Sequence, residues 1–407
     1  MEYAMVSMLI PKEYEDTFRA CAKHTMQDAA NALQWNLYQG LCENLGQDIP
    51  LFNTLPCGSY PQYYSRPFVP RFSFGAKGQN LSFCNVKVIR NRFKTKAIKK
   101  ALLNWCRSSR EPKTLFIYTI SQPLLSAVAT VKKKYPQLHV CSIVADLPNM
   151  SNLSSKQGRL LRMFSAHKAK EAYSLLSSVD SFVLLTKHMA DYMHITQPFC
   201  VVEGIAPTVS EANTKSETVG GEDERIILYT GTLHCKFGVL HLLDAFRKVS
   251  DPRARLVICG IGDSEAEIRE ASRQDPRIDF RGQLRRDEVL SLQKKAAVLV
   301  NPRLNNEEFT KYSFPSKTME YLASGVPVVA YKLDGIPDEY DAYITYPDGD
   351  SSDALVATLE HLCSLSSDEL SRMGSAARQF VTEQKNRNVQ TKKILDSVQG
   401  AITADQD

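Results

Sequence analysis

The sequence contains no Cys-x-x-Cys pair, although it has ten cysteines in 407 residues. They lie singly, and several occupy apolar segments, as Cys141, Cys200 and Cys259 do. A free cysteine in such a segment behaves as a small hydrophobic side chain. The histidines likewise show neither a catalytic-triad nor a metal-ligand spacing. We therefore expect no metal site and no disulfide framework.

Long apolar runs are also missing. No segment approaches the roughly 18 uncharged apolar residues of a membrane-spanning helix. The apolar run at residues 4–10 is too short for the core of a signal peptide and has no basic residues before it. With 43% hydrophobic and 23% charged residues, the composition is that of a globular protein. We expect the protein to be cytoplasmic.

The glycine fingerprint of a dinucleotide site is incomplete. Gly260 and Gly262 begin such a pattern, but Glu265 occupies the position of the third glycine. A tight turn between a strand and a helix explains the two glycines at least as well. The pattern argues against a nicotinamide cofactor, and we predict that the protein uses no cofactor.

The charge is unevenly distributed. Residues 1–200 contain 25 Lys and Arg against 12 Asp and Glu, whereas residues 201–407 contain 25 against 33. Residues 87–113 alone contain ten basic residues and one acid, with apolar residues between them. One interpretation is a basic amphipathic helix that contacts anionic lipid, peripherally on the inner face of the cell membrane. The other is an ordinary surface helix whose apolar residues face the core.

Apolar, β-branched segments alternate with amphipathic ones along the chain, which is typical of α/β domains with parallel sheets. A chain of this length exceeds a single hydrophobic core. We predict two doubly wound domains facing each other across a cleft. Residues 1–204 would form the first, 205–224 a linker, 225–385 the second, and 386–407 a C-terminal helix or tail packing back on the first domain.

The pattern also predicts the individual elements. The expected strands are 4–10, 50–54, 85–89, 115–119, 139–144, 181–185, 225–230, 255–260, 278–282, 297–301 and 326–331. The expected helices are 25–45, 126–135, 156–177, 238–249, 265–273 and 287–295.

Residues 312–329 have the sequence of a loop, a helix and a buried strand. Pro315 suits the first helical turn, and Ser313 could cap it. The amides of Ser316 and Lys317 would then favour an anion such as a diphosphate. Glu320 lies one turn further on, where its carboxylate could accept hydrogen bonds from ribose hydroxyls.

Further candidates follow the strands of the second domain. Gly231 would allow close approach of a ligand, and Lys236 would supply a mobile cation for a leaving diphosphate. The main chain near Leu284 and Arg285 could face a nucleobase. Each of these loops is also explained by a plain turn, and it is their combination with the helix start at Ser316 that favours a phosphate site.

In the first domain, Asp146 ends a strand, at the sheet edge where acceptor chemistry could occur. An Asp that caps the following turn is the alternative interpretation. Residues 119–123 and 27–36 could also line the cleft.

These motifs resemble glycosyltransferase family 4, from about residue 226 to 360. The resemblance implies the GT-B fold and transfer of a sugar from a nucleotide donor with retention of configuration. It implies that Glu320 holds the ribose and that the Ser316 and Lys317 amides bind the distal phosphate. The segments 32–37 and 58–61 are similar to a bacterial capsule and exopolysaccharide subgroup.

The chain departs from the family pattern at three positions. Lys236 lies one residue before the usual lysine, and Thr232 replaces the usual arginine. Tyr312 occupies the position of the first glutamate of the Glu-x7-Glu pattern, so that either Tyr312 or Glu308 could contact the donor sugar. The predicted donor site also includes Ser313 and Phe314.

The resemblance implies a metal-independent hexosyltransferase that uses a nucleoside diphosphate sugar, of the UDP-sugar type, and a glycan or lipid-linked acceptor, with no nucleic acid partner. Lys236, Glu320, Asp146 and Tyr312 are its candidate catalytic residues. A non-catalytic GT-B partner or scaffold subunit and a GT-B sugar epimerase are the alternatives.

Overall fold

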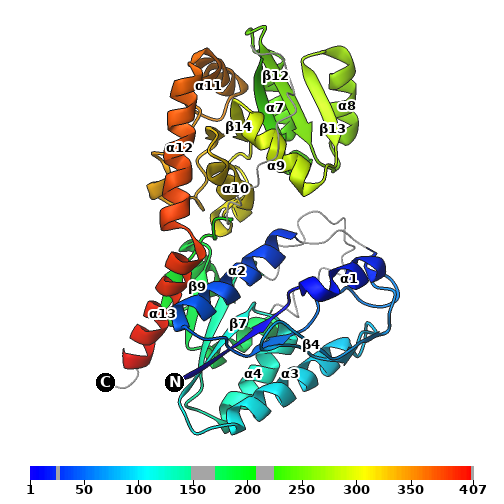
Figure 1. Ribbon diagram of the computed structural model, residues 1–407, viewed down its shortest axis with the longest axis vertical. Coiled ribbons are helices and arrows are strands. Elements are labelled where there is room, and N and C mark those ends of the chain that lie inside the picture. Colours follow the sequence, from blue (N-terminus) through cyan, green and yellow to red (C-terminus); the bar gives the residue numbers. More distant parts are fainter. Residues whose placement is uncertain (24–27, 148–169, 208–223, 405–407) are drawn as a thin grey trace. The chain divides into compact units, whose positions relative to one another are not determined.

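The computed structural model divides into two compact units (Figure 1). Unit 1 is Met1–Glu203 with Arg387–Asp407, and unit 2 is Gly204–Asn386. The residues described are 1–23, 28–147, 170–207 and 224–404. Most of the expected linker, and most of the helix expected at 156–177, lie outside the described residues.

Among the described residues, unit 1 contains an eight-stranded sheet with the order β10-β9-β8-β7-β1-β2-β5-β4. Neighbouring strands are parallel except β4 and β5. The chain places β2 on one side of β1 and β7 on the other, so the strand order reverses at β1. The strands are β1 (Glu2–Ser7), β2 (Leu51–Asn53), β4 (Phe72–Phe74), β5 (Gly78–Asn80), β7 (Lys113–Tyr118), β8 (His139–Val144), β9 (Ser181–Leu184) and β10 (Phe199–Val201).

Three polar residues at one level of this sheet fix the loops at its carboxyl edge. Ser7 lies beside Asn53, and Asn53 lies beside Asn80 in the strand register. The Ser7 hydroxyl donates to Asn53 Oδ1 at 3.0 Å, and Asn53 Nδ2 donates to Asn80 Oδ1 at 3.1 Å. Asn53 also bonds both backbone groups of Leu9, just after β1. Fully paired polar groups of this kind hold a buried edge rigidly.

The helices of unit 1 cover this sheet. The basic helix α3 buries Ile98, Leu102 and Trp105, which share one face at i, i+4 and i+7. The apolar residues of α3 therefore face the core. The unit 1 helices described are α1 (Glu15–Cys21), α2 (Asp28–Leu45), α3 (Arg90–Arg107), α4 (Gln122–Lys134), α6 (His188–Met193) and α13 (Arg387–Ala404).

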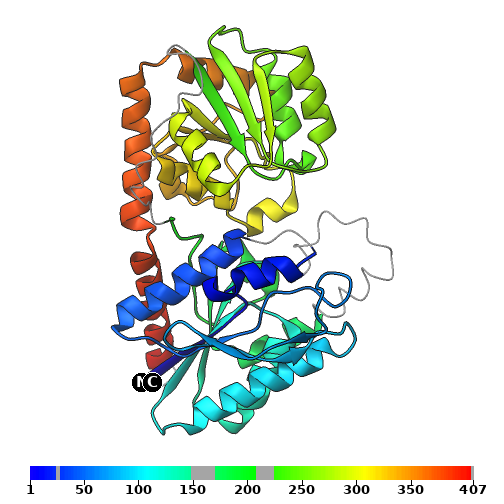
Figure 2. The ribbon, with the colours of Figure 1, turned by 45° about the vertical axis from the view of Figure 1, so that its right-hand side comes forward.

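The C-terminal helix α13 lies beside α2, as Figure 2 shows in red and blue. Asn44 Nδ2 on α2 donates to Thr391 Oγ1 and to the Asn388 carbonyl, both at 2.8 Å. A Cβ on Gly40 would lie 2.6 Å from Thr391 Oγ1, so glycine permits this close approach. The end of the chain is thereby part of unit 1.

Unit 2 contains a six-stranded sheet in the described residues, with the order β13-β12-β11-β14-β15-β16 and only parallel pairs. This order reverses between β11 and β14, as in a doubly wound fold. The strands are β11 (Arg225–Thr230), β12 (Ala254–Cys259), β13 (Ile278–Gly282), β14 (Val298–Asn301), β15 (Val328–Ala330) and β16 (Ile344–Thr345). The α-helices are α7 (Val239–Phe246), α8 (Glu265–Gln274), α9 (Arg286–Lys295), α10 (Ser316–Ser324), α11 (Ser352–Ser364) and α12 (Ser367–Gln384).

The predicted strands at 139–144, 225–230 and 278–282 have the same bounds in the structure. The strand predicted at 85–89 is wrong. The chain instead pairs β3 (Phe68–Val69) with β6 (Phe83–Cys84) and then turns, with the Arg90 N–H bonded to the Val86 carbonyl at 2.9 Å. Val88 is 87% exposed, and Val86 and Ile89 are exposed too, so the apolar side chains of this segment lie on the surface and not in a sheet.

No helix in the described part of the chain is long and apolar enough to cross a membrane.

Candidate functional site

Helix α10 is anchored to the carboxyl end of β11, where the strand order of unit 2 reverses. The Tyr321 hydroxyl accepts from the Thr230 N–H at 2.8 Å and donates to the Thr230 carbonyl at 3.0 Å. Tyr321 is completely buried. Open α/β sheets bind ligands at such a reversal, so α10 lies where a site is expected.

The start of α10 has no side-chain cap. Its N-cap is Pro315, and the first described intrahelical bond runs from Thr318 N–H to the Pro315 carbonyl at 2.9 Å. The cap predicted at Ser313 is wrong, because the Ser313 hydroxyl donates to the carbonyl of Phe309 at 3.1 Å. The amides of Ser316 and Lys317, the first two residues of α10, precede this bond and carry the positive end of the helix dipole.

Glu320 lies one turn into α10 within a network of donors. Its Oε1 accepts from Gln293 Nε2 at 2.7 Å and from Lys317 Nζ at 2.8 Å, and its Oε2 lies 3.7 Å from Arg286. Burial alone would raise the pKa of Glu320, but Lys317, Gln293 and Arg286 outweigh it and lower the pKa. Glu320 is therefore an anion at neutral pH, with oxygens able to accept from hydroxyl groups.

Gln293, which no sequence motif marks, is fully buried in the last turn of α9. Its amide Nε2 also donates to Thr230 Oγ1 at 3.3 Å, so one side chain joins the end of β11 to Glu320. Only its place in a helix predicted at 287–295 could have drawn attention to it.

Glycines allow the loops after β11 and β12 to touch. A Cβ on Gly260, whose φ is +145°, would lie 1.8 Å from the Gly231 carbonyl oxygen. A Cβ on Gly262 would lie 2.2 Å from the Leu233 carbonyl oxygen. Gly231 N–H bonds the Cys259 carbonyl at 3.0 Å, and the Thr232 carbonyl accepts from the Tyr229 hydroxyl at 2.8 Å. Gly260 and Gly262 thus allow the loops after β11 and β12 to pack closely against each other.

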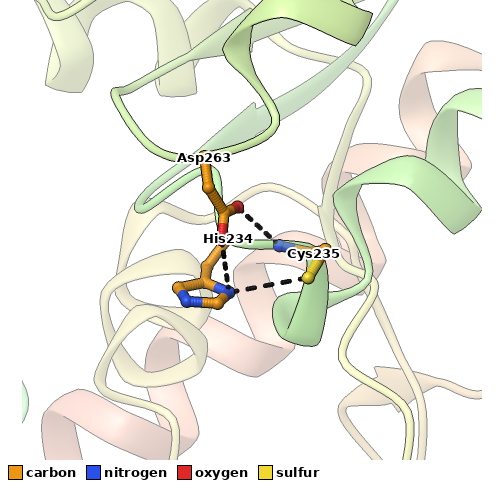
Figure 3. Close-up of side chains that lie close together, drawn as sticks. All are labelled: His234, Cys235 and Asp263. Carbon is orange, nitrogen blue, oxygen red and sulfur yellow. Dashed lines mark hydrogen bonds and ion pairs between the residues drawn. The ribbon is translucent and has the colours of Figure 1, made fainter. Parts of the chain in front are cut away.

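Lys236 lies in the short helix η3 (Cys235–Phe237), directly after this loop. Figure 3 shows how Asp263 holds the loop from the next strand connection. Its Oδ1 accepts from the Cys235 N–H at 3.0 Å, and its Oδ2 lies 3.2 Å from His234 Nδ1. These contacts fix the backbone that carries the half-buried Lys236.

His234, Cys235 and Asp263 also form the one group of three potential metal ligands found among the described residues. Their ligand atoms lie within 4.8 Å of one another. The sequence did not reveal this group because Asp263 is remote in the chain. A tetrahedral zinc site needs a fourth ligand, and here both Asp263 oxygens already bond the loop, so we interpret the group as a loop anchor.

Arg303, which follows β14, is a second site residue that no sequence motif marks. Its guanidinium lies 4.3 Å from the ring centroid of Phe237 and 5.4 Å from that of Phe309. Burial lowers its pKa to about 10, so it remains charged, and its Nε has no acceptor among the described residues. A fixed cation therefore packs against η3, next to Lys236.

Tyr312 and Glu308, the two alternatives for the missing glutamate, lie together. Both belong to the short helix η4 (Glu308–Tyr312), and the Tyr312 hydroxyl donates to Glu308 Oε1 at 3.4 Å. Phe314, by contrast, is only 7% exposed, and its ring lies 5.1 Å from that of Tyr340. The Phe314 side chain belongs to the core because apolar residues surround it, and its predicted donor contact stays a prediction.

The loop before α9 differs from its prediction. The Arg285 N–H is bonded to Glu288 Oε2 at 2.8 Å, and the Arg285 carbonyl accepts from Val289 N–H at 3.0 Å. Arg285 caps α9 in this way, and its main chain is not directed to a nucleobase. Leu284, half-buried against the core, remains the candidate from this loop.

Asp146 lies in unit 1, two residues after β8. The residue is exposed, yet neighbouring protein atoms partly desolvate its carboxyl group and raise its pKa. Because Asp146 closely follows β8, it lies at the carboxyl edge of the unit 1 sheet, as predicted.

Residues 224–364 match the family described as "Glycosyl transferases group 1". No curated protein matches the chain. The fold resembles sucrose-phosphate synthase from Thermosynechococcus elongatus, at 14% identity and a TM-score of 0.63, over 99% of this chain and 100% of that one. It also resembles HepE from Anabaena in complex with UDP, at 12% identity and a TM-score of 0.59, over 98% and 100%.

A third similar structure is the lipopolysaccharide outer core galactosyltransferase WaaB, at 13% identity and a TM-score of 0.62, over 98% of this chain and 99% of that one. These likenesses confirm the predicted fold class. The chain therefore has the GT-B fold with two Rossmann-like domains, and its match to the glycosyl transferases group 1 family covers residues 224–364.

Proposed function

We propose that the protein is a retaining glycosyltransferase of the family 4 type. It moves a hexose-type sugar from a nucleoside diphosphate donor to a hydroxyl of a glycan or lipid-linked acceptor. The observation that carries this proposal is the uncapped start of α10 with the ionised Glu320 one turn further on, at the reversal between β11 and β14.

The residues of unit 2 suit this donor. The Ser316 and Lys317 amides bind the distal phosphate, and Lys236 and Arg303 add positive charge near the leaving diphosphate. Arg303 thereby compensates for Thr232, which stands where the family has an arginine. Glu320 accepts hydrogen bonds from the ribose hydroxyls, and the main chain near Leu284 lies toward the base.

In the transfer step, the bond between the anomeric carbon and the phosphate oxygen breaks as the acceptor oxygen bonds to the same face of that carbon. The acceptor proton passes to the departing phosphate oxygen, so atoms and charge balance without a histidine base. Because these protein cations neutralise the leaving group, we propose that the reaction is metal-independent. Turnover that survives a chelator supports this, and turnover restored only by added Mg²⁺ or Mn²⁺ opposes it.

The solved structures support the donor and process that we propose. HepE was solved with UDP, and WaaB is a lipopolysaccharide galactosyltransferase. We infer a UDP-sugar donor and a role in bacterial cell-surface polysaccharide synthesis for this chain.

Donor turnover tests the assignment. We expect Lys236→Ala and Glu320→Ala each to lower turnover at least tenfold, as the loss of a hydrogen bond to a charged group, about 1.5–3 kcal/mol, implies. Lys294→Ala, at an exposed position of α9, is the matched control and should keep wild-type turnover. Wild-type activity in both site variants would refute the proposal.

A non-catalytic scaffold is the competing function, because Thr232 and Tyr312 depart from the family pattern. Calorimetric titration with nucleoside diphosphates separates the two. A transferase binds one of them, whereas a scaffold shows no heat at millimolar ligand.

We also propose that α3 contacts anionic membrane. Its basic side forms a groove of about 870 Å³ together with α4, lined by Arg92, Lys96, Lys99, Lys100 and Arg107 among others. The face of α3 that contains Ile98, Leu102 and Trp105 is buried. The apolar contact therefore comes from Val88, just before α3, and from Phe93 on another side of the helix, 87% and 44% exposed. Sedimentation with phosphatidylserine vesicles should fall when Lys96, Lys99 and Lys100 are reversed to Glu. Indifference to that reversal would exclude the contact.

A further inference from the structure

Unit 1 contains a cavity of about 230 Å³ at the point where its strand order reverses. Val6 and Met8 from the end of β1, Thr54 after β2, and Ser121 and Pro123 after β7 line it. It has the same topological position in unit 1 as the candidate donor site has in unit 2. Ligands bind outside the carboxyl ends of parallel strands at such positions.

A buried lysine lines this cavity. Lys94 on α3 is 4% exposed, and its Nζ lies 4.6 Å from the ring centroid of Phe83. No described residue forms an ion pair or hydrogen bond with its ammonium group. Burial, and then the neighbouring Arg90, lower the pKa of Lys94 to about 7, against a small opposing effect of the Cys57 thiol.

Arg90 lies one helical turn before Lys94 and lines the same cavity. Its guanidinium is largely buried, which lowers its pKa, and its Nε has no acceptor among the described residues. Two neighbouring buried cations without an acid are expensive in free energy. A structural role alone does not explain why both occur on one face of α3.

The first turn of α4 adds to the positive potential. Ser121, Pro123 and Leu124 of that turn line the cavity, and no side chain caps the helix at Ser121. Thr95 Oγ1 on α3 donates to the Pro123 carbonyl at 3.0 Å. Helices α3 and α4 lie side by side (Figure 1). The positive end of the α4 dipole therefore lies beside Arg90 and Lys94.

We propose that this cavity binds a phosphoryl group carried by the acceptor. Two cations and a helix start together match a phosphate dianion better than a single carboxylate. At ~30 Å³ for each water molecule, the cavity volume of about 230 Å³ corresponds to nearly eight waters, which accommodates a phosphoryl group and part of the group that carries it. The assignment to the acceptor rests on the proposed transferase function, whereas binding of the anion does not.

Calorimetric titration of the full chain with inorganic phosphate at pH 6.5 tests the site. A Lys236→Met background removes the mobile side-chain cation proposed for the donor diphosphate, which weakens phosphate binding in unit 2, so that the heat reports on unit 1. Adding Lys94→Met should weaken phosphate binding at least tenfold. Lys133→Met, at an exposed position in the last turn of α4, lines neither this cavity nor the basic groove and should change it less than twofold. Equal affinity with and without Lys94 overturns the site.

Further ligands identify the source of the anion. Glycerol 3-phosphate should bind at least as tightly as inorganic phosphate, and glycerol should not bind. Binding of phosphate but not of the monoester overturns an acceptor-borne group, and tighter binding of glucuronate overturns the phosphoryl assignment.

Two measurements separate this inference from the proposed function. Acceptor-independent donor hydrolysis should stay within twofold of wild type in Lys94→Met. If wild type turns over no donor, the transferase proposal fails while the phosphate result still stands. Arg90→Gln repeats the test if Lys94→Met does not fold, and phosphate affinity unchanged in Arg90→Gln likewise overturns the site.

Discussion

The two units place charge differently at the same point of the same architecture. In unit 2 the anion Glu320 is held by Lys317, Gln293 and, at longer range, Arg286. In unit 1 the cations Lys94 and Arg90 line a cavity without an acid among the described residues. Both locations lie where the strand order of a parallel sheet reverses.

This difference indicates what each location requires from a ligand. A carboxylate that already has cationic and amide donors does not destabilise the unliganded protein. When hydroxyl groups bind, they replace some of those donors. Uncompensated buried cations lower the stability of the unliganded protein, and an anion that binds there restores it. The free energy of unfolding of each unit therefore reports whether the charges at its site are compensated in the absence of a ligand.

The largest expected effect is on the stability of unit 1. Removing the buried charge by Lys94→Met should raise the free energy of unfolding at pH 6.5, by up to roughly 5 kcal/mol for a pKa lowered from 10.5 to about 7. Trp35 and Trp105, the two tryptophans of the chain, both lie in unit 1, so urea unfolding followed by their fluorescence reports on this unit.

The pH dependence gives the sign of this effect. Below about pH 7 Lys94 is protonated in the folded and unfolded states, and the full penalty is present. Between about pH 7 and the usual value near 10.5 the folded state releases the proton first, so wild-type stability rises. The difference from Lys94→Met should shrink by pH 9.5. A variant less stable than wild type at pH 6.5 would show that Lys94 supports the fold.

The second effect concerns the compensated acid of unit 2. Glu320→Gln keeps the shape but removes the charge, so nucleoside diphosphate affinity should fall about 10–100-fold, or roughly 1.5–3 kcal/mol. The lowered pKa of Glu320 means that wild-type binding is retained above the usual carboxyl value of 4.5 and is lost only as the pH falls through the depressed value. Titration calorimetry measures both.

Glu267→Gln, at an exposed position of α8, is the control for this substitution and should bind as wild type does. Equal affinity in Glu320→Gln and the control would mean that Glu320 only holds Lys317 in place.

The third effect is structural and confined to unit 2. Tyr321→Phe removes the hydroxyl that accepts from the Thr230 N–H, and an unsatisfied buried donor costs about 1–3 kcal/mol. Circular dichroism should show an earlier unfolding transition, while the tryptophan fluorescence transition of unit 1 stays in place. A shift in both transitions would show that the two units unfold together.

The sequence predicted the central strands of both sheets because these strands are apolar and buried on both faces, whereas the short strands β4, β5, β10 and β16 were not predicted. Residues 139–144 and 225–230 are completely or almost completely buried, and their bounds were predicted correctly. The run at 85–89 also contains β-branched residues, but Val86, Val88 and Ile89 are exposed in a turn before α3, so β-branched content alone does not predict a strand there.

The predictable parts of the site are those formed by residues that are close together in the sequence. The helix start at Ser316 and the position of Glu320 follow from helical spacing. Gln293, Arg303 and the cavity around Lys94 depend on which segments the fold brings together, and no local pattern marks them. Ser313 and Arg285 were misassigned because nearer partners, Phe309 and Glu288, satisfy them.

The smallest expected effect belongs to Tyr312 and Glu308, the pair that replaces the missing glutamate of unit 2. Their 3.4 Å contact is exposed, and such contacts contribute at most about 1 kcal/mol, so Tyr312→Phe and Glu308→Gln should each lower donor turnover by about fivefold or less. A double variant decides whether they act together. If the loss in the double variant equals that of one single variant, the two residues form one unit that contacts the donor. Losses that multiply instead assign them separate roles, and a loss above a hundredfold in Glu308→Gln alone would make Glu308 the functional equivalent of the missing glutamate.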